Sequence, residues 1–291
     1  MRVRAVRRAV AAALVGGVIA TVGLTGCEPP PDTYVAMGDS YVAGPLIPVQ
    51  STAPLGCLRS NRNYASLVKP KIRVAKFVDV SCSGATTDDF WAAQDVQPGP
   101  ANPPQFDALN RQTKVVTFGI GGNDIGFTSI VINCGTSLPN DPGCKGDYVH
   151  DGRDELSERI AATAPKIDRV LKEIKRRAPR ATILLVGYPT VLPETGTGCY
   201  PLVPVLPADV PYLRAKVKEL NAMLRNRAAA GGATYIDIAP VSVGHDFCQP
   251  LAKWVEGLTP TTAAAPVHPN AAGMAGWAPM VAAAINRVVT S

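Results

Sequence analysis

Short apolar runs rich in β-branched residues alternate along the chain with longer segments of helical period. Five of these runs have the length and composition of buried strands: 33–37, 72–80, 114–120, 181–187 and 233–238. Continuous apolar strands separated by helices are typical of a parallel sheet that is covered on both faces. We therefore expect an α/β protein, a three-layer α/β/α sandwich around a central, mostly parallel five-stranded sheet.

Three segments carry apolar residues at steps of three or four, the spacing of one helix face. The first helix is expected over 153–177, with a kink at Pro165, and the second ends at Gly231-Gly232. Asn270 is the natural N-cap of the third. The three stripes consist of Leu156, Ile160, Ala164, Ile167, Leu171 and Ile174; Leu213, Val217, Leu220 and Leu224; and Met274, Trp277, Val281, Ile285 and Val288. The proline-rich segments 97–104 and 201–211 read as loops.

Residues 1–26 have the plan of an export signal, with a cationic head and an apolar stretch of small residues. The segment ends in Leu24-Thr25-Gly26-Cys27, which resembles a bacterial lipobox, in which the cysteine receives a diacylglycerol. We expect an exported membrane lipoprotein that faces the extracytoplasmic space: lipidated Cys27, a short tether over 27–32 and a single domain over 33–291. A secreted protein with an ordinary cleaved signal, or an uncleaved anchor, is the alternative. The apolar run is shorter than the about 20 residues that span a membrane.

The charge of the chain argues against a nucleic-acid partner. The formal net charge of +6 includes the four arginines of the signal, which leaves +2 over the remainder. The other basic residues are scattered or lie on expected helix faces, so a solvated surface explains them. A nucleotide cofactor is not expected either, because the run Gly119–Asp124 lacks the third glycine of the dinucleotide fingerprint and no Walker lysine follows a glycine run. We expect a monomer without a cofactor.

The cysteine count fits an exported protein. Seven cysteines are present, and six remain when Cys27 is set aside as the lipidation site: Cys57, Cys82, Cys134, Cys144, Cys199 and Cys248. An even set in an exported chain predicts three disulfides, with fifteen possible pairings. Free buried thiols are the alternative. None of the spacings is C-x-x-C, so we expect no zinc or other metal site.

Three short polar blocks carry the candidate chemistry. Gly38-Asp39-Ser40 follows the first apolar run, Gly121-Gly122-Asn123-Asp124 follows the third, and His268-Pro269-Asn270 precedes the last helix. The loops past the carboxyl ends of parallel strands gather at one edge of a sheet, where ligands bind. The topology therefore allows a hydroxyl nucleophile, a side-chain amide and an imidazole to meet. Ser40 does not belong to a G-x-S-x-G elbow, because position 42 is valine.

These blocks resemble those of the SGNH, or GDSL, hydrolase family, and the likeness covers nearly the whole chain after the signal. Its four blocks correspond, in the family's order, to Gly38-Asp39-Ser40-Tyr41, Ser81-Cys82-Ser83-Gly84-Ala85-Thr86, Gly121-Gly122-Asn123-Asp124 and His268-Pro269-Asn270. The resemblance implies a flavodoxin-like fold, with Ser40 as nucleophile and His268 as base. It also implies an oxyanion hole made of the Ser40 and Gly84 backbones and the Asn123 side chain.

One position departs from the family pattern. Most members carry an aspartate three residues before the histidine, where this chain has Ala265, and downstream of Cys248 the only carboxylate is Glu256. Some secreted actinobacterial members use a main-chain carbonyl instead. The resemblance to them implies a Ser40–His268 dyad oriented by the carbonyl of Ala265 or Pro266, and the pairs Cys57–Cys82, Cys134–Cys144 and Cys199–Cys248.

The remaining polar candidates have structural explanations. His150 and His245 are weaker candidates for the base, and Asp39 and Asp124 are expected to hold their turns through hydrogen bonds to backbone. Leu202, Val203, Val205 and Leu206 are interleaved with prolines and form either an apolar wall for an acyl chain or a cover for the core beside Cys199.

The function expected from the residues and the resemblance is that of a serine carboxylic ester hydrolase, a lipase or esterase. It would cleave acyl esters through an acyl-enzyme intermediate and act on lipid esters at the cell envelope. The alternatives are a deacetylase of envelope or extracellular polysaccharide, whose substrate is an acylated sugar, and a non-catalytic lipoprotein that keeps the fold as a binding module.

Overall fold

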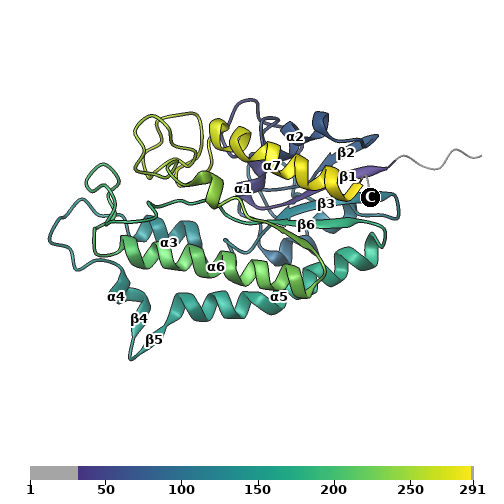
Figure 1. The fold of residues 1–291 in the computed structure, drawn as a ribbon. Helices are drawn as coiled ribbons and strands as arrows, with labels where there is room; N and C mark the ends of the chain where they lie inside the picture. Colours follow the sequence, from purple (N-terminus) through teal and green to yellow (C-terminus); the bar gives the residue numbers. More distant parts are fainter. Residues whose placement is uncertain (1–31, 290–291) are drawn as a thin grey trace, which may run out of the picture. The chain divides into compact units, whose positions relative to one another are not determined.

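The computed structural model describes residues 32–289, which belong to one compact unit (Figure 1). The predicted signal peptide, the expected lipidation site Cys27 and the expected tether up to residue 31 lie outside the described residues. No helix among residues 32–289 is long and apolar enough to cross a membrane.

A five-stranded parallel sheet forms the middle of the unit, in the order β2-β1-β3-β6-β7. Its strands are β1 (Thr33–Gly38), β2 (Lys76–Asp79), β3 (Thr113–Gly119), β6 (Thr182–Val186) and β7 (Thr234–Ile236). The sheet confirms the predicted α/β class, and its order is that of flavodoxin-like folds. Because the strand order reverses between β1 and β3, the carboxyl ends of these two strands border the crevice where such folds bind ligands.

Helices cover both faces of the sheet, as predicted. Figure 1 shows α5 (Glu155–Arg177) and α6 (Val210–Ala230) along one face and α7 (Ala271–Val289) with α2 (Tyr64–Val68) on the other. Successive residues of β1 point to opposite faces. Val35 and Met37 join the apolar cluster under α5 and α6, whereas Tyr34 and Ala36 join the one under α7. One strand thus contributes to both halves of the core.

Two of the three long helices, α5 and α7, begin at side-chain caps. Asp154 Oδ1 accepts hydrogen bonds from the backbone N–H groups of Leu156 and Ser157, at 3.1 and 3.3 Å, which starts α5 two residues later than expected. This helix continues through Pro165. Asn270 Oδ1 accepts from the N–H of Gly273 at 3.0 Å, the predicted cap of α7.

Several short elements carry no periodic signal in the sequence. They are α1 (Ser40–Ala43), α3 (Phe127–Asn133), α4 (Lys145–Tyr148) and the small hairpin of β4 (Val149–His150) and β5 (Arg153–Asp154). Single turns of 3₁₀ helix occur at Leu55–Cys57, Lys69–Lys71, Thr87–Phe90, Gln105–Ala108 and Pro240–Ser242. A strand was expected over 72–80, and the first part of that range is instead an irregular segment before β2.

Three disulfides connect the loops of the unit: Cys57–Cys82, Cys134–Cys144 and Cys199–Cys248. This is the pairing that the family resemblance implied. The first bridge lies next to the segment that follows β2, and Cys82 N–H also donates to the carbonyl of Gly38 at 2.9 Å. This hydrogen bond holds the second polar block against the end of β1, and the disulfide ties the same block to the turn at Leu55–Cys57.

Candidate active site

The turn that presents Ser40 depends on a glycine at the end of β1. Gly38 has φ +136°, and a Cβ there would lie 2.2 Å from the carbonyl oxygen of Gly119 in β3. No side chain fits in that space, so only glycine allows the two strand ends to come this close. Asp39 then caps α1, because its Oδ1 accepts the N–H of Tyr41 at 2.9 Å. Ser40 is the first residue of the helix, and its own N–H has no intrahelical acceptor.

A buried glutamine holds this turn from the other side. Gln105 is fully buried, and its Oε1 accepts the N–H of Gly38 at 2.7 Å. Its Nε2 donates to the carbonyl of the same glycine at 2.9 Å. Both backbone groups of Gly38 are therefore paired with one side chain, which fixes the backbone two residues before Ser40.

The hydroxyl of Ser40 meets the imidazole of His268, although the two residues are 228 positions apart. Ser40 Oγ lies 2.7 Å from His268 Nε2, and His268 Nδ1 lies 2.6 Å from the carbonyl oxygen of Pro266. A carbonyl only accepts, so Nδ1 carries the proton and Nε2 is free to accept from the serine. Burial lowers the pKa of His268 below its usual value, against the opposing effect of the Pro266 hydrogen bond.

The loop that carries His268 is held at its backbone. Tyr41 OH donates to the carbonyl of Val267 at 2.7 Å, and Val267 adopts φ +64°, an unusual value for a β-branched residue. Glu256 N–H donates to the carbonyl of His268 at 2.9 Å. Tyr41, the residue after Ser40, thus fixes Val267, the residue before His268.

Glu256 does not contact the imidazole, but it organises the same loop. Its buried carboxylate accepts from Asn270 Nδ2 at 2.8 Å, from the N–H of Thr261 at 2.8 Å and from Thr262 Oγ1 at 2.7 Å. The resulting hydrogen bonds hold the pKa of Glu256 below its usual value despite burial. The one carboxylate downstream of Cys248 is therefore fully used by donors other than His268.

Asn123 and Gly84 lie at the same edge of the sheet. Asn123 Nδ2 donates to the carbonyl of Ala85 at 2.8 Å, which uses one of the two amide hydrogens and leaves the other. Gly84 has φ +81°, a conformation that glycine adopts without strain. Its loop is fixed by Gln94 Nε2, which donates to the carbonyl of Ser83 at 2.8 Å.

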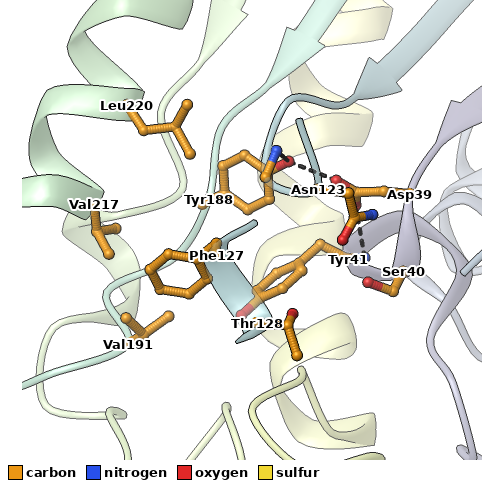
Figure 2. Close-up of a pocket in the computed structure, with 11 residues that line it drawn as sticks. Asp39, Ser40, Tyr41, Asn123, Phe127, Thr128, Tyr188, Val191, Val217 and Leu220 are labelled. Carbon is orange, nitrogen blue, oxygen red and sulfur yellow. Dashed lines mark hydrogen bonds between the residues drawn. The ribbon is translucent and has the colours of Figure 1, made fainter. Parts of the chain in front are cut away.

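A narrow recess opens beside Ser40 (Figure 2). Eleven residues line it: Asp39, Ser40, Tyr41, Gly122, Asn123, Phe127, Thr128, Tyr188, Val191, Val217 and Leu220. In Figure 2, Phe127, Val191 and Val217 lie at the end away from Ser40. The recess is therefore polar at the serine and apolar at its far end.

Comparisons with known proteins show the family of the chain. A family model of the GDSL-like lipase/acylhydrolase family matches residues 36–275. Lipase 2 of Streptomyces coelicolor is 41% identical over 247 residues, 82% of this chain and 81% of that protein. The chain belongs to the GDSL-like lipase/acylhydrolase family.

Two solved structures extend the likeness to the whole fold. The extracellular lipase of Streptomyces rimosus has a TM-score of 0.72 at 28% identity, and phospholipase A1 of Streptomyces albidoflavus has 0.68 at 27%. Each comparison covers 86% of this chain and 98% of the other. The family and the lipase relatives together show that this protein is a carboxylic ester hydrolase.

Tyr188 is a site residue that the sequence did not suggest. Its hydroxyl donates to Asp39 Oδ2 at 2.5 Å and accepts the N–H of Gly122 at 2.7 Å, so it joins the first and third blocks. Burial raises the pKa of the Asp39 carboxyl to about 7, although the hydrogen bonds from Tyr188 and Tyr41 oppose this. Tyr188 comes two residues after β6, so the strand-end rule that singled out Ser40 and Asn123 also applied to it.

Asp124, His150 and His245 each have a partner outside the Ser40–His268 pair. Asp124 Oδ2 accepts the N–H of Thr87 at 3.0 Å, so this carboxylate joins the third block to the residue after the second block, and the expectation that it holds its own turn was wrong. His150 Nε2 contacts the carbonyl of Asp147, and the His245 ring stacks on Trp254. Within residues 32–289 no cluster of ligand side chains fits a metal ion.

The apolar residues after Cys199 do not line the recess. Val203, Val205 and Leu206 are buried, and the first two belong to the core cluster against which Cys199 packs. Leu202 is 67% exposed. Of the two explanations offered for this segment, the structure supports a cover for the core.

The raised pKa of Asp39 predicts a specific pH effect on stability. The folded protein favours the neutral carboxyl, so the contribution of Asp39 is present below about pH 4 and is lost as the pH rises through about 7. Asp39→Asn cannot ionise. Its free energy of unfolding relative to the wild type should therefore rise by about 3 kcal/mol between pH 5 and pH 8, measured by urea denaturation. The exposed Asp88→Asn is the matched control, and parallel curves for wild type and Asp39→Asn would contradict the analysis.

Proposed function

We propose that this carboxylic ester hydrolase cleaves acyl lipids through a covalent intermediate on Ser40, with His268 as general base. The observation that carries the proposal is the contact of 2.7 Å between Ser40 Oγ and His268 Nε2, with the opposite ring nitrogen on a carbonyl. A serine hydroxyl is a poor nucleophile at neutral pH, and a neutral imidazole in hydrogen-bond contact is the group that activates it.

The reaction proceeds in two halves. Ser40 Oγ attacks the ester carbonyl while His268 Nε2 takes its proton, and the carbonyl oxygen becomes an oxyanion. The tetrahedral intermediate then collapses, and His268 returns the proton to the departing alcohol. Water attacks the acyl-enzyme, again giving a proton to His268, and the carboxylic acid leaves as Ser40 recovers its hydrogen.

Three donors are assigned to the oxyanion: the N–H groups of Ser40 and Gly84 and the remaining amide hydrogen of Asn123. The helix-start position of Ser40 and the fixed loops of the other two residues support this assignment. Donors held in place before the charge develops stabilise it without reorganisation.

The Pro266 carbonyl takes the orienting role that an aspartate has in most of the family. It lies 2.6 Å from Nδ1, whereas the other candidate, the Ala265 carbonyl, accepts the backbone N–H of His268 at 3.3 Å. A carbonyl selects the tautomer and the ring orientation but supplies no countercharge to the imidazolium, so catalysis rests more heavily on the oxyanion donors.

Lipid esters are the proposed substrates because the recess beside Ser40 ends in apolar side chains, which suit an acyl chain better than an acetyl group. Relatives named lipase and phospholipase A1 support this choice. The lipobox-like sequence at Cys27 and the three disulfides support an exported enzyme that is anchored at the cell envelope by its lipid.

A fluorophosphonate probe tests the nucleophile directly. The wild type should be labelled at Ser40, identified by peptide mapping, and Ser40→Ala should not be labelled. His268→Gln should react at least about 100-fold more slowly, because the general base is lost. His245→Gln is the matched histidine control and should react like the wild type. A folded wild-type protein that stays unlabelled would instead identify a non-catalytic binding module.

Asn123→Ala tests the oxyanion assignment. It should lower kcat by about 100-fold or more, corresponding to about 3 kcal/mol, and change KM little, because the lost hydrogen bond forms with the transition state. Asn133→Ala, at an exposed position of α3, is the control. Unchanged kcat in a folded Asn123→Ala variant would remove this side chain from the mechanism.

A further inference from the structure

A second, larger pocket adjoins the recess beside Ser40. This outer pocket has a volume of about 1000 Å³ including its open mouth, and it lies between α6, the loop after β6 and the segment after β7. Val191 and Val217 line both the recess and the outer pocket. Side chains that face two adjoining spaces lie between them, so these two valines separate the recess from the outer pocket.

We propose that Val191 and Val217 form the end wall of the acyl-binding recess and set the length of the acyl chain that the enzyme prefers. With the wall in place, a chain that enters beside Ser40 stops at the two valines. With the wall shortened, the chain continues into the outer pocket. The proposal rests on the ester hydrolysis proposed above for Ser40.

The recess is assigned to the acyl chain, and not to the alcohol, because of where the histidine lies. The leaving oxygen must be within reach of His268 Nε2 to receive its proton. His268 is not among the residues that line the recess, whereas Asn123, assigned to the carbonyl oxygen, is. The alcohol therefore leaves on the His268 side, and the recess extends from the carbonyl carbon in the other direction.

Hydrogen bonds on both sides of Val191 hold the backbone of this part of the wall. Thr190 N–H donates to Ser242 Oγ at 2.7 Å, and the carbonyl of Val191 accepts the N–H of Phe247 at 3.1 Å. Val217 lies within α6 and is buried in the same apolar cluster as Val191. The volumes of the two side chains, rather than a loop movement, therefore define the end of the recess.

The outer pocket suits the continuation of an acyl chain. Half of its lining is apolar, and the residues of this kind are Pro189, Val191, Leu192, Val217, Ala239, Pro240 and Val243. Four of its five charged residues neutralise each other, because Lys218 pairs with Glu194 at 2.6 Å and Arg225 pairs with Asp237. The fifth, Arg214, donates to the carbonyl of Gly196 at 2.6 Å.

The experiment compares acyl-chain preference in the purified enzyme on p-nitrophenyl esters from acetyl to hexadecanoyl. In Val191→Ala/Val217→Ala, the ratio of kcat/KM for the dodecanoyl ester to that for the butanoyl ester should rise at least about tenfold, since each newly buried methylene contributes a factor of about four. Adding Ala239→Leu, which narrows only the outer pocket, should reverse much of this gain. Val191→Ile and Val217→Ile should move the preference to shorter chains, and they test the wall without opening the core.

Val210→Ala is the matched control, because Val210 is a buried valine of the same helix that lines neither space. It should keep the wild-type chain-length profile. An unchanged profile in the double alanine variant and in both isoleucine variants, with activity on the butanoyl ester retained, would overturn the proposal. So would an equal shift in Val210→Ala. A wild type that hydrolyses none of the esters and resists the fluorophosphonate would instead refute the function itself.

Discussion

The hydrogen bond between Ser40 and His268 is the interaction on which the rest of the site depends. The two residues come from opposite ends of the described chain and meet at 2.7 Å. The parallel sheet makes this possible, since the end of β1 and the loop before α7 open at the same edge. Gly38 allows β1 to approach β3, Gln105 fixes the backbone of Gly38, and Tyr41 ties the serine turn to Val267. Each of these contacts controls the distance between one hydroxyl and one imidazole.

Among the described residues, no carboxylate makes a hydrogen bond to the imidazole of His268. The ring is buried and faces the Pro266 carbonyl, so burial lowers its pKa and the hydrogen bond to that carbonyl opposes the shift. The carboxylates in the vicinity are engaged elsewhere: Glu256 by its own loop, and Asp39 by Tyr188 and Tyr41. Glu256 therefore acts on the imidazole only through the geometry of the loop that holds it.

Much of this arrangement is visible in the sequence because it follows from local chemistry. Apolar runs of strand length predict the five strands, and the strand-end rule brings Ser40 and Asn123 to one edge. The disulfide pairing is different, because six cysteines allow fifteen pairings, and the choice among them came from the family resemblance. The family pattern made the missing acid at Ala265 visible, and the carbonyl of Ala265 or Pro266 as its substitute was likewise implied by the resemblance to secreted actinobacterial members.

The recess could not be predicted in the same way. Val217 and Leu220 follow the helical period of α6, and a periodic apolar residue looks the same whether it packs in the core or lines a pocket. The link between Tyr188 and Asp39 joins residues 149 positions apart, and no pattern along the chain encodes such a contact. The apolar segment after Cys199 misleads in the other direction. Its composition suits the wall of a binding pocket, but its buried residues cover the core.

The most direct test of the account is the protonation state of His268, measured by ¹⁵N NMR of histidine-labelled protein. The chain has three histidines, and the His150→Gln and His245→Gln variants assign the remaining signals. The account predicts that His268 stays neutral at pH 7, with the proton on Nδ1 and a titration midpoint below 6.5, because burial outweighs the Pro266 hydrogen bond. An imidazolium at pH 7, or a neutral ring with its proton on Nε2, would contradict it.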